Sequence, residues 1–208
     1  MTGAVVGYDP GGNGRHGLAV LDLADGAARA LAVSTHPTVE SVLEAIEATA
    51  PLAVGVDSLT CWGTGRSGWR PADRWLRAQY PAVARSVASP NSLYGSMSLG
   101  GMAALLTLRA RDPGVVVTET HPKVLYRAFW RRHHDYAAEG RAMDRDLSLA
   151  LGLDVRTAND HEWDAAVSAF AALHALRDDW TLDLHALPLL GGERLVAPCG
   201  PTRYAWPG

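Results

Sequence analysis

Lysine, cysteine and long apolar runs are scarce in this chain, and each scarcity excludes a class of protein. Lys123 is the only lysine, although Lys and Arg together number 19 in 208 residues. Cys61 and Cys199 are the only cysteines, and their wide separation excludes a disulfide framework and a zinc ribbon. No apolar run approaches the roughly 20 residues of a membrane-spanning helix, so we expect no membrane partner.

Hydrophobic residues, by contrast, are plentiful, at 48% of the chain, which is enough for a sizeable core. The length fits a single domain over residues 1–208. A net charge of -3 excludes a uniformly basic nucleic-acid-binding protein, although local basic patches remain possible. Met1, Thr2 and Gly3 lead directly into a predicted strand without a signal peptide, so we expect a cytoplasmic location.

The hydrophobic periodicity predicts an α/β protein. Three strands at residues 4–9, 18–23 and 28–33 form an antiparallel meander, because a turn at residues 24–26 joins the last two. Further strands are predicted at 52–57, 115–119 and 193–197, and helices from Thr38, at 71–79, at 98–109, after Pro122, before Gly152 and from Asn159. This is the element order of the ribonuclease H-like fold, a mixed five-stranded sheet flanked by helices.

Acidic residues follow the predicted strands at the points where those strands end. Asp9, Asp57 and Glu119 end the first, fourth and fifth strands, and Asp160 and Asp164 lie one turn apart on the last helix. Strand ends at one edge of a sheet converge in space, and clustered carboxylates repel unless a cation lies between them. The pattern predicts a Mg²⁺ or Mn²⁺ site suited to phosphate chemistry, with all five acids as candidate ligands.

Each acid also has a structural interpretation. Asp9 before Pro10 is common in Asx turns, and Asp57 could cap the turn that follows its strand. Glu119 could be a simple charge at a strand terminus, and Asp160 could favour the N-terminus of its helix electrostatically. We favour the catalytic interpretation for Asp57 and Asp164. For Asp9, Glu119 and Asp160, the catalytic interpretation depends on whether the acids lie together in the fold.

Residues 58–97 are predicted to form an inserted segment, and within it the stretch from Trp62 to Trp75 interleaves aromatics with arginines. Such a mixture can hold phosphates and stack bases in proteins that bind single strands. The candidate substrate-binding residues are Arg66, Arg70, Asp73, Arg74, Arg77 and, outside the segment, Lys123. Arg70 can alternatively pair with Asp73 and position the loop, and the remaining arginines can equally form a solvated helix face.

The motifs and their order resemble those of a known family. The stretch from Val6 to Gly11 looks like the first strand of Holliday-junction resolvases. The whole chain resembles the family numbered four hundred and twenty-nine among the domains of unknown function, whose members are predicted nucleases. The matching residues are Gly7-Tyr8-Asp9, Val56-Asp57-Ser58-Leu59, Arg70 to Arg74 with Arg77, Glu119-Thr120-His121-Pro122, and Asp160 to Ala165. The resemblance implies an acidic cluster of Asp9, Asp57, Glu119 and Asp164.

These observations predict a metal-dependent nuclease whose partner is DNA or RNA. One rival is a nucleotide-binding ATPase or kinase of the related actin type, which needs a second such domain that 208 residues do not provide. Another rival is a non-catalytic binding module that has kept the fold. The four retained acids favour catalysis, and metal titration separates these interpretations.

Overall fold

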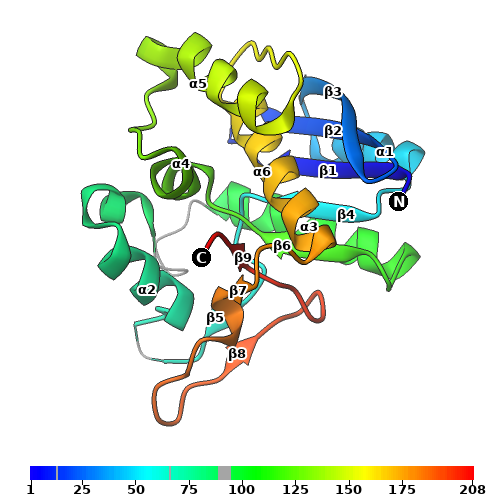
Figure 1. Ribbon diagram of the computed structural model, residues 1–208. Helices are drawn as coiled ribbons and strands as arrows, with labels where there is room; N and C mark the ends of the chain where they lie inside the picture. Colours follow the sequence, from blue (N-terminus) through cyan, green and yellow to red (C-terminus); the bar gives the residue numbers. More distant parts are fainter. Residues whose placement is uncertain (13, 66, 89–94) are drawn as a thin grey trace.

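The structure is a computed structural model that describes residues 1–12, 14–65, 67–88 and 95–208 (Figure 1). Its centre is a five-stranded sheet in the order β3-β2-β1-β4-β6. The strands are β1 Gly3–Asp9, β2 His16–Ala24, β3 Ala27–His36, β4 Ala53–Val56 and β6 Val116–Glu119. β1, β2 and β3 are antiparallel neighbours, whereas β4 is parallel to both β1 and β6. The predicted ribonuclease H-like architecture is confirmed.

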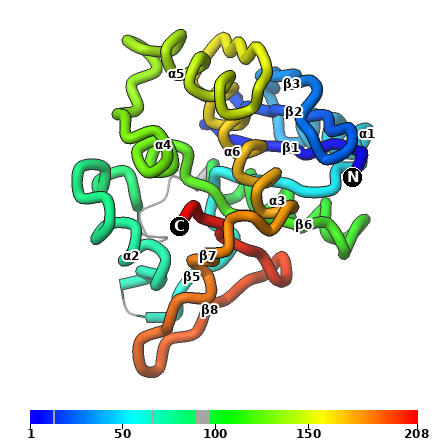
Figure 2. The backbone as a smooth tube through the Cα atoms, viewed as in Figure 1, coloured from blue at the N-terminus to red at the C-terminus, as the bar shows by residue number. Residues whose placement is uncertain are grey.

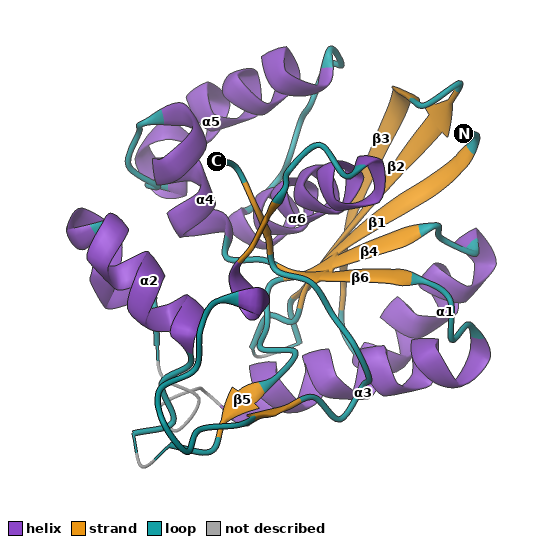
Figure 3. Cartoon of the chain, turned by 60° about the horizontal axis from the view of Figure 1, so that its bottom comes forward, coloured by secondary structure: helices purple, strands orange, loops and turns teal. Residues whose placement is uncertain are grey.

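Helices cover the two faces of this sheet (Figure 3). α1 Val39–Thr49 and α3 Gly95–Arg111 lie on one face, where an apolar cluster joins Val6, Val54 and Ile46. α4 Pro122–Trp130, α5 Tyr136–Leu151 and α6 Asp160–Arg177 lie on the other side. There a second cluster joins Val5 and Ala53 to α6. The central strands β1 and β4 are therefore buried on both faces, as the sequence of β4 predicted.

α6 lies unusually close to the sheet because glycines face it. A Cβ atom on Gly7 would lie 1.8 Å from the carbonyl oxygen of Ala165, and one on Gly55 would lie 2.0 Å from that of Ser168. Neither distance is possible for real atoms, so only glycine permits this approach. The helix begins after Asn159, whose side chain accepts a hydrogen bond of 3.0 Å from the Glu162 amide.

The inserted segment packs against the C-terminal part of the chain. It contains β5 Trp62–Gly63, α2 Pro71–Gln79 and a 3₁₀ turn η1 Pro81–Ser86. β5 pairs with β8 Leu195–Val196, which lies within the strand predicted at 193–197. A 3₁₀ turn η3 Leu184–Ala186 packs against α2. The periodicity had not indicated the small sheet of β7 Leu182–Asp183 and β9 Ala205–Trp206.

The last residues return to the central sheet (Figure 2). Arg203 forms an isolated parallel bridge with Thr118: the amide of Glu119 donates to the Arg203 carbonyl at 2.8 Å, and the amide of Arg203 donates to the Val117 carbonyl at 2.9 Å. The tail therefore adds backbone hydrogen bonds at the outer edge of β6. No helix among the described residues has the length and apolarity needed to cross a membrane.

Candidate metal centre

The register of the parallel strands decides which strand-end acids share a face of the sheet. Tyr8 pairs with Val56, so Asp9 and Asp57 follow at the same level. Val56 also pairs with Glu119, which places Glu119 one residue earlier than Asp57. Because side chains alternate along a strand, Asp57 and Glu119 point to opposite faces. Asp9 and Asp57 lie on the α6 face, and Glu119 does not.

Asp164 completes a group with Asp9 and Asp57, which we call the acid cluster. It comes from the second turn of α6, and a hydrogen bond of 2.7 Å between Ser168 and Thr120 fixes that helix beside the end of β6. Asp9 and Asp164 are 2% and 4% exposed, while Asp57 is half-buried. Three carboxylates from β1, β4 and α6 therefore occupy one small volume.

The acid cluster is electrostatically strained. Burial is the main cause that raises the pKa of Asp9 to about 6, and the charge of Asp164 raises it further. Burial also raises the pKa of Asp57 well above its usual value, with the charges of Asp9 and Asp164 adding to the effect. Asp9 and Asp57 thus resist ionisation, and a divalent cation would relieve the repulsion between the carboxylates.

Two cationic groups lie beside the acid cluster. His161 donates from Nδ1 to Asp9 Oδ2 at 2.6 Å, and this hydrogen bond is the main cause that raises the pKa of His161. Burial alone would lower the pKa of Lys123, but the charges of Asp164, Asp57 and Asp9 raise it. One lysine and one histidine still leave three aspartates with an excess of negative charge.

One oxygen of the acid cluster has no hydrogen-bond partner. Asp164 Oδ1 is buried and lies 3.3 Å from His134 Nε2, and neither atom makes a hydrogen bond within the described part of the chain. A buried carboxylate oxygen without a donor is costly, so the position calls for a cation. The residues present therefore fit a divalent metal ion.

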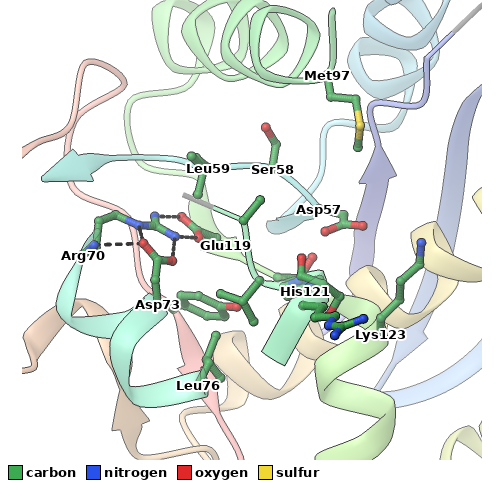
Figure 4. Close-up of a pocket in the computed structure, with 16 residues that line it drawn as sticks. Asp57, Ser58, Leu59, Arg70, Asp73, Leu76, Met97, Glu119, His121 and Lys123 are labelled. Carbon is green, nitrogen blue, oxygen red and sulfur yellow. Dashed lines mark hydrogen bonds and ion pairs between the residues drawn. The ribbon is translucent and has the colours of Figure 1, made fainter. Parts of the chain in front are cut away.

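A cavity of about 420 Å³ opens beside the acid cluster (Figure 4). Asp57, His121 and Lys123 line one side of it, and the side chains of Arg70, Asp73 and Glu119 lie on the other. Its apolar lining comes from Leu59, Leu76, Val87 and Met97. His121 donates from Nε2 to the Ser86 carbonyl at 2.9 Å, while its buried Nδ1 is without a partner in the described structure. The cavity thus offers polar groups next to an apolar wall.

Glu119 was predicted to lie with Asp9, Asp57 and Asp164, but its hydrogen-bond partners belong to a different group of residues. Arg70 donates to both of its oxygens, at 2.7 and 2.5 Å, and also to both oxygens of Asp73, at 3.0 and 2.7 Å. The charge of Arg70 overcomes the effect of burial and lowers the pKa of Glu119. We call Arg70, Asp73 and Glu119 the Arg70 network. It ties the inserted segment to β6 and leaves these three side chains little freedom to bind a substrate or an ion.

Cys61 and His185 adjoin the Arg70 network. Among the described residues, Cys61, Glu119 and His185 are the group whose ligand atoms all lie within 4.8 Å of one another, a spacing that the acid cluster does not meet. Glu119 Oε2 already accepts hydrogen bonds from the amide and hydroxyl of Thr60, at 2.9 and 3.1 Å, besides that from Arg70. Because the lone pairs of Glu119 Oε2 already accept these hydrogen bonds, we interpret Cys61, Glu119 and His185 as part of a buried ion pair and not as an ion-binding site.

The other predicted substrate contacts are engaged inside the molecule. Arg74 binds Glu193 at 2.7 Å, and Arg77 donates to the carbonyls of Ala84 and Val87. The Arg77 guanidinium also lies 4.9 Å from the centre of the Trp69 ring. Arg66 lies outside the described residues. Lys123 lies beside the acid cluster and lines the cavity, and its role as a substrate contact stays a prediction.

Asp160, the fifth predicted ligand, stands apart from the acid cluster. Its side chain is 50% exposed and lies 4.0 Å from His161 Nε2. Its position in the first turn of α6 favours the N-terminus of that helix.

Sequence reasoning assigned no role at the acid cluster to His161 or His134. His161 had a usable signal, because it precedes Asp164 by three residues and must share a helix side with it. His134 lies in the connection between α4 and α5, and no spacing in the sequence links it to Asp164. His185 is likewise brought to Glu119 by the fold alone.

Comparisons with known proteins give structural relatives only. No protein family matches the chain, and no curated protein does. Two solved structures of RuvC are similar to it. RuvC of T. thermophilus in complex with a Holliday junction substrate has a TM-score of 0.47 and 20% identity, over 85% of this chain and 94% of that chain. A second Thermus thermophilus RuvC structure has a TM-score of 0.47 and 19% identity, over 83% of this chain and 95% of that one.

Proposed function

We propose that this protein is a metal-dependent nuclease that hydrolyses phosphodiester bonds in DNA or RNA. The observation that carries the proposal is the convergence of Asp9, Asp57 and Asp164 at one end of the sheet. Their charges oppose one another in a buried volume, and Asp164 Oδ1 has no donor among the described residues. Such an arrangement is costly for stability and is explained by cation binding.

Asp9, Asp57 and Asp164 would hold Mg²⁺ or Mn²⁺. The ion would polarise a phosphate oxygen and lower the pKa of a bound water. We also propose that the chain belongs to the predicted nuclease family numbered four hundred and twenty-nine, because its motifs occur in order along nearly the whole chain.

The neighbouring side chains have roles that follow from their positions. His161 holds a proton at Nδ1 against Asp9 and fixes the orientation of that carboxylate. Lys123 carries a positive charge beside the acids and can neutralise a phosphate oxygen. The cavity next to Asp57 has room for a nucleotide that adjoins the cleaved phosphate. Arg70 and Arg74 have no part in this scheme, because their guanidinium groups pair with Glu119 and Glu193.

A cleavage assay tests the proposal. Single-stranded, duplex and four-way-junction DNA and single-stranded RNA would be incubated with the protein and Mn²⁺ or Mg²⁺. We expect cleavage of at least one substrate, its loss with EDTA, and a decrease of about a hundredfold or more in Asp57→Asn.

Asp22→Asn is the matched control, because Asp22 is an exposed aspartate on β2 outside the acid cluster. It should retain wild-type activity. Cleavage that persists undiminished in Asp57→Asn, or in EDTA, would contradict the proposal.

A further inference from the structure

His134 lies beside the acid cluster but belongs to none of the motifs. It is the penultimate residue of the connection between α4 and α5, and its ring packs edge-on against Trp163 at a centroid distance of 5.2 Å. Its side chain is 10% exposed, whereas its neighbour His133 is exposed. Packing against Trp163 holds the imidazole in one orientation next to Asp164.

The two facing atoms of His134 and Asp164 are both unsatisfied. His134 Nε2 and Asp164 Oδ1 are buried, lie 3.3 Å apart and do not form a hydrogen bond with each other or with another described group. Two ligands about 2.1 Å from one ion lie roughly 3 Å apart when they subtend a right angle. The observed separation therefore suits two ligands of the same cation better than an empty contact.

We propose that His134 is a nitrogen ligand of the metal centre and shares one ion with Asp164. This inference rests on the proposed function and adds the identity of the preferred metal. An all-oxygen site suits Mg²⁺, whereas an imidazole ligand increases affinity for transition metals such as Mn²⁺. The protein should therefore bind Mn²⁺ more tightly than Mg²⁺, and His134 should cause much of that preference.

Pulsed electron paramagnetic resonance on Mn²⁺-loaded protein tests this directly. A coordinated imidazole gives ¹⁴N modulation of the electron spin echo, which a carboxylate ligand does not. We expect this modulation in the wild type and in His133→Gln, and its loss in His134→Gln. Calorimetry should give a loss of Mn²⁺ affinity of about tenfold or more in His134→Gln, with a smaller change for Mg²⁺.

Two further variants keep the inference falsifiable. His134→Asn replaces His134→Gln if circular dichroism indicates that the latter is unfolded. His161→Gln removes the other nearby imidazole, whose Nδ1 is occupied by Asp9, and should retain the modulation.

The outcomes separate this inference from the proposed function. Bound Mn²⁺ without ¹⁴N modulation, or modulation that survives in His134→Gln, would overturn the role of His134 and leave the carboxylate site intact. No saturable Mn²⁺ binding by the wild type would overturn the proposed metal centre itself.

Discussion

Three carboxylates, Asp9, Asp57 and Asp164, lie close enough to interact with one another and with Lys123. The positions of Asp9 and Asp57 could be predicted from sequence, because apolar strands end in these acids, and Asp164 could be placed on the last helix. The exclusion of Glu119 could not be predicted, because it depends on a one-residue difference in register between β4 and β6. Register is fixed by the packing of both faces, which a single strand does not reveal.

Mn²⁺ should stabilise the wild type and should hardly affect Asp57→Asn. At a hundredfold excess over the dissociation constant, binding contributes about 2.7 kcal/mol. This corresponds to an increase of roughly 5–10 °C in Tm for a domain of this size. Metal-free Asp57→Asn should be at least as stable as the metal-free wild type, because the substitution removes one of the repelling charges. Thermal unfolding with and without Mn²⁺ measures both effects.

Asp22→Asn serves as the control and should keep the full Mn²⁺ effect. If Mn²⁺ raised the Tm of Asp57→Asn as much as that of the wild type, the ion would bind elsewhere.

Because of His185, the free energy of unfolding should decrease as the pH rises into the alkaline range. Burial alone would lower its pKa, but hydrogen bonds to Cys61 and Glu119 raise it to about 10. A raised histidine pKa stabilises the fold fully below the unfolded pKa near 6.5, and this contribution is lost as pH rises through about 10. The contribution is on the order of 5 kcal/mol at most.

Urea unfolding at pH 6, 8 and 10 tests this dependence. The free energy of unfolding should fall with pH more steeply in the wild type and in His133→Gln than in His185→Gln. Parallel pH profiles for all three proteins would refute the assignment.

At the scale of elements, the contact between α6 and the sheet positions Asp164. The helix and its start at Asn159 could be predicted from capping and periodicity, and the predicted helix at 71–79 coincides with α2. The pairing of Arg70 with Asp73, one of the two predicted alternatives, is confirmed, but the pairing of Arg70 with Glu119 and of Arg74 with Glu193 could not be predicted. Their partners, Glu119 and Glu193, are distant in sequence, so a helix with several arginines resembled a phosphate-binding face.

Gly55→Ala should disrupt the contact between α6 and the sheet. The new Cβ would lie 2.0 Å from the Ser168 carbonyl oxygen, so the helix must move away from the sheet. We expect a loss of about 3 kcal/mol in the free energy of unfolding, measured with urea. The Mn²⁺ effect on Tm should also shrink, because Asp164 moves with the helix.

Gly191→Ala is the matched control, since no atom lies within 4 Å of the added Cβ. It should change stability by less than about 0.5 kcal/mol. A similarly small change in Gly55→Ala would contradict the close approach of α6.

At the scale of the whole molecule, two distant segments close around the outer edge of the sheet. The inserted segment brings Arg70 to Glu119, and the C-terminal tail brings His185 to the same carboxylate and Arg203 to β6. The arrangement of the five central strands could be predicted because their order along the chain, with the helices between them, is that of the ribonuclease H-like fold. The closing segments could not, because two-residue strands such as β7 and β9 carry too little periodicity.

This closure separates two groups of ionisable residues. The Arg70 network holds the inserted segment in place on one side of the cavity, while Asp57 of the acid cluster lines the other side. The central claim is that only the second group is the metal centre.

Anomalous diffraction from crystals soaked in Mn²⁺ is the most direct measurement of this claim. We predict a strong Mn²⁺ peak coordinated by carboxylates of the acid cluster, with Asp164 among the ligands. A peak at Cys61, Glu119 and His185 with none at the acid cluster would contradict the account.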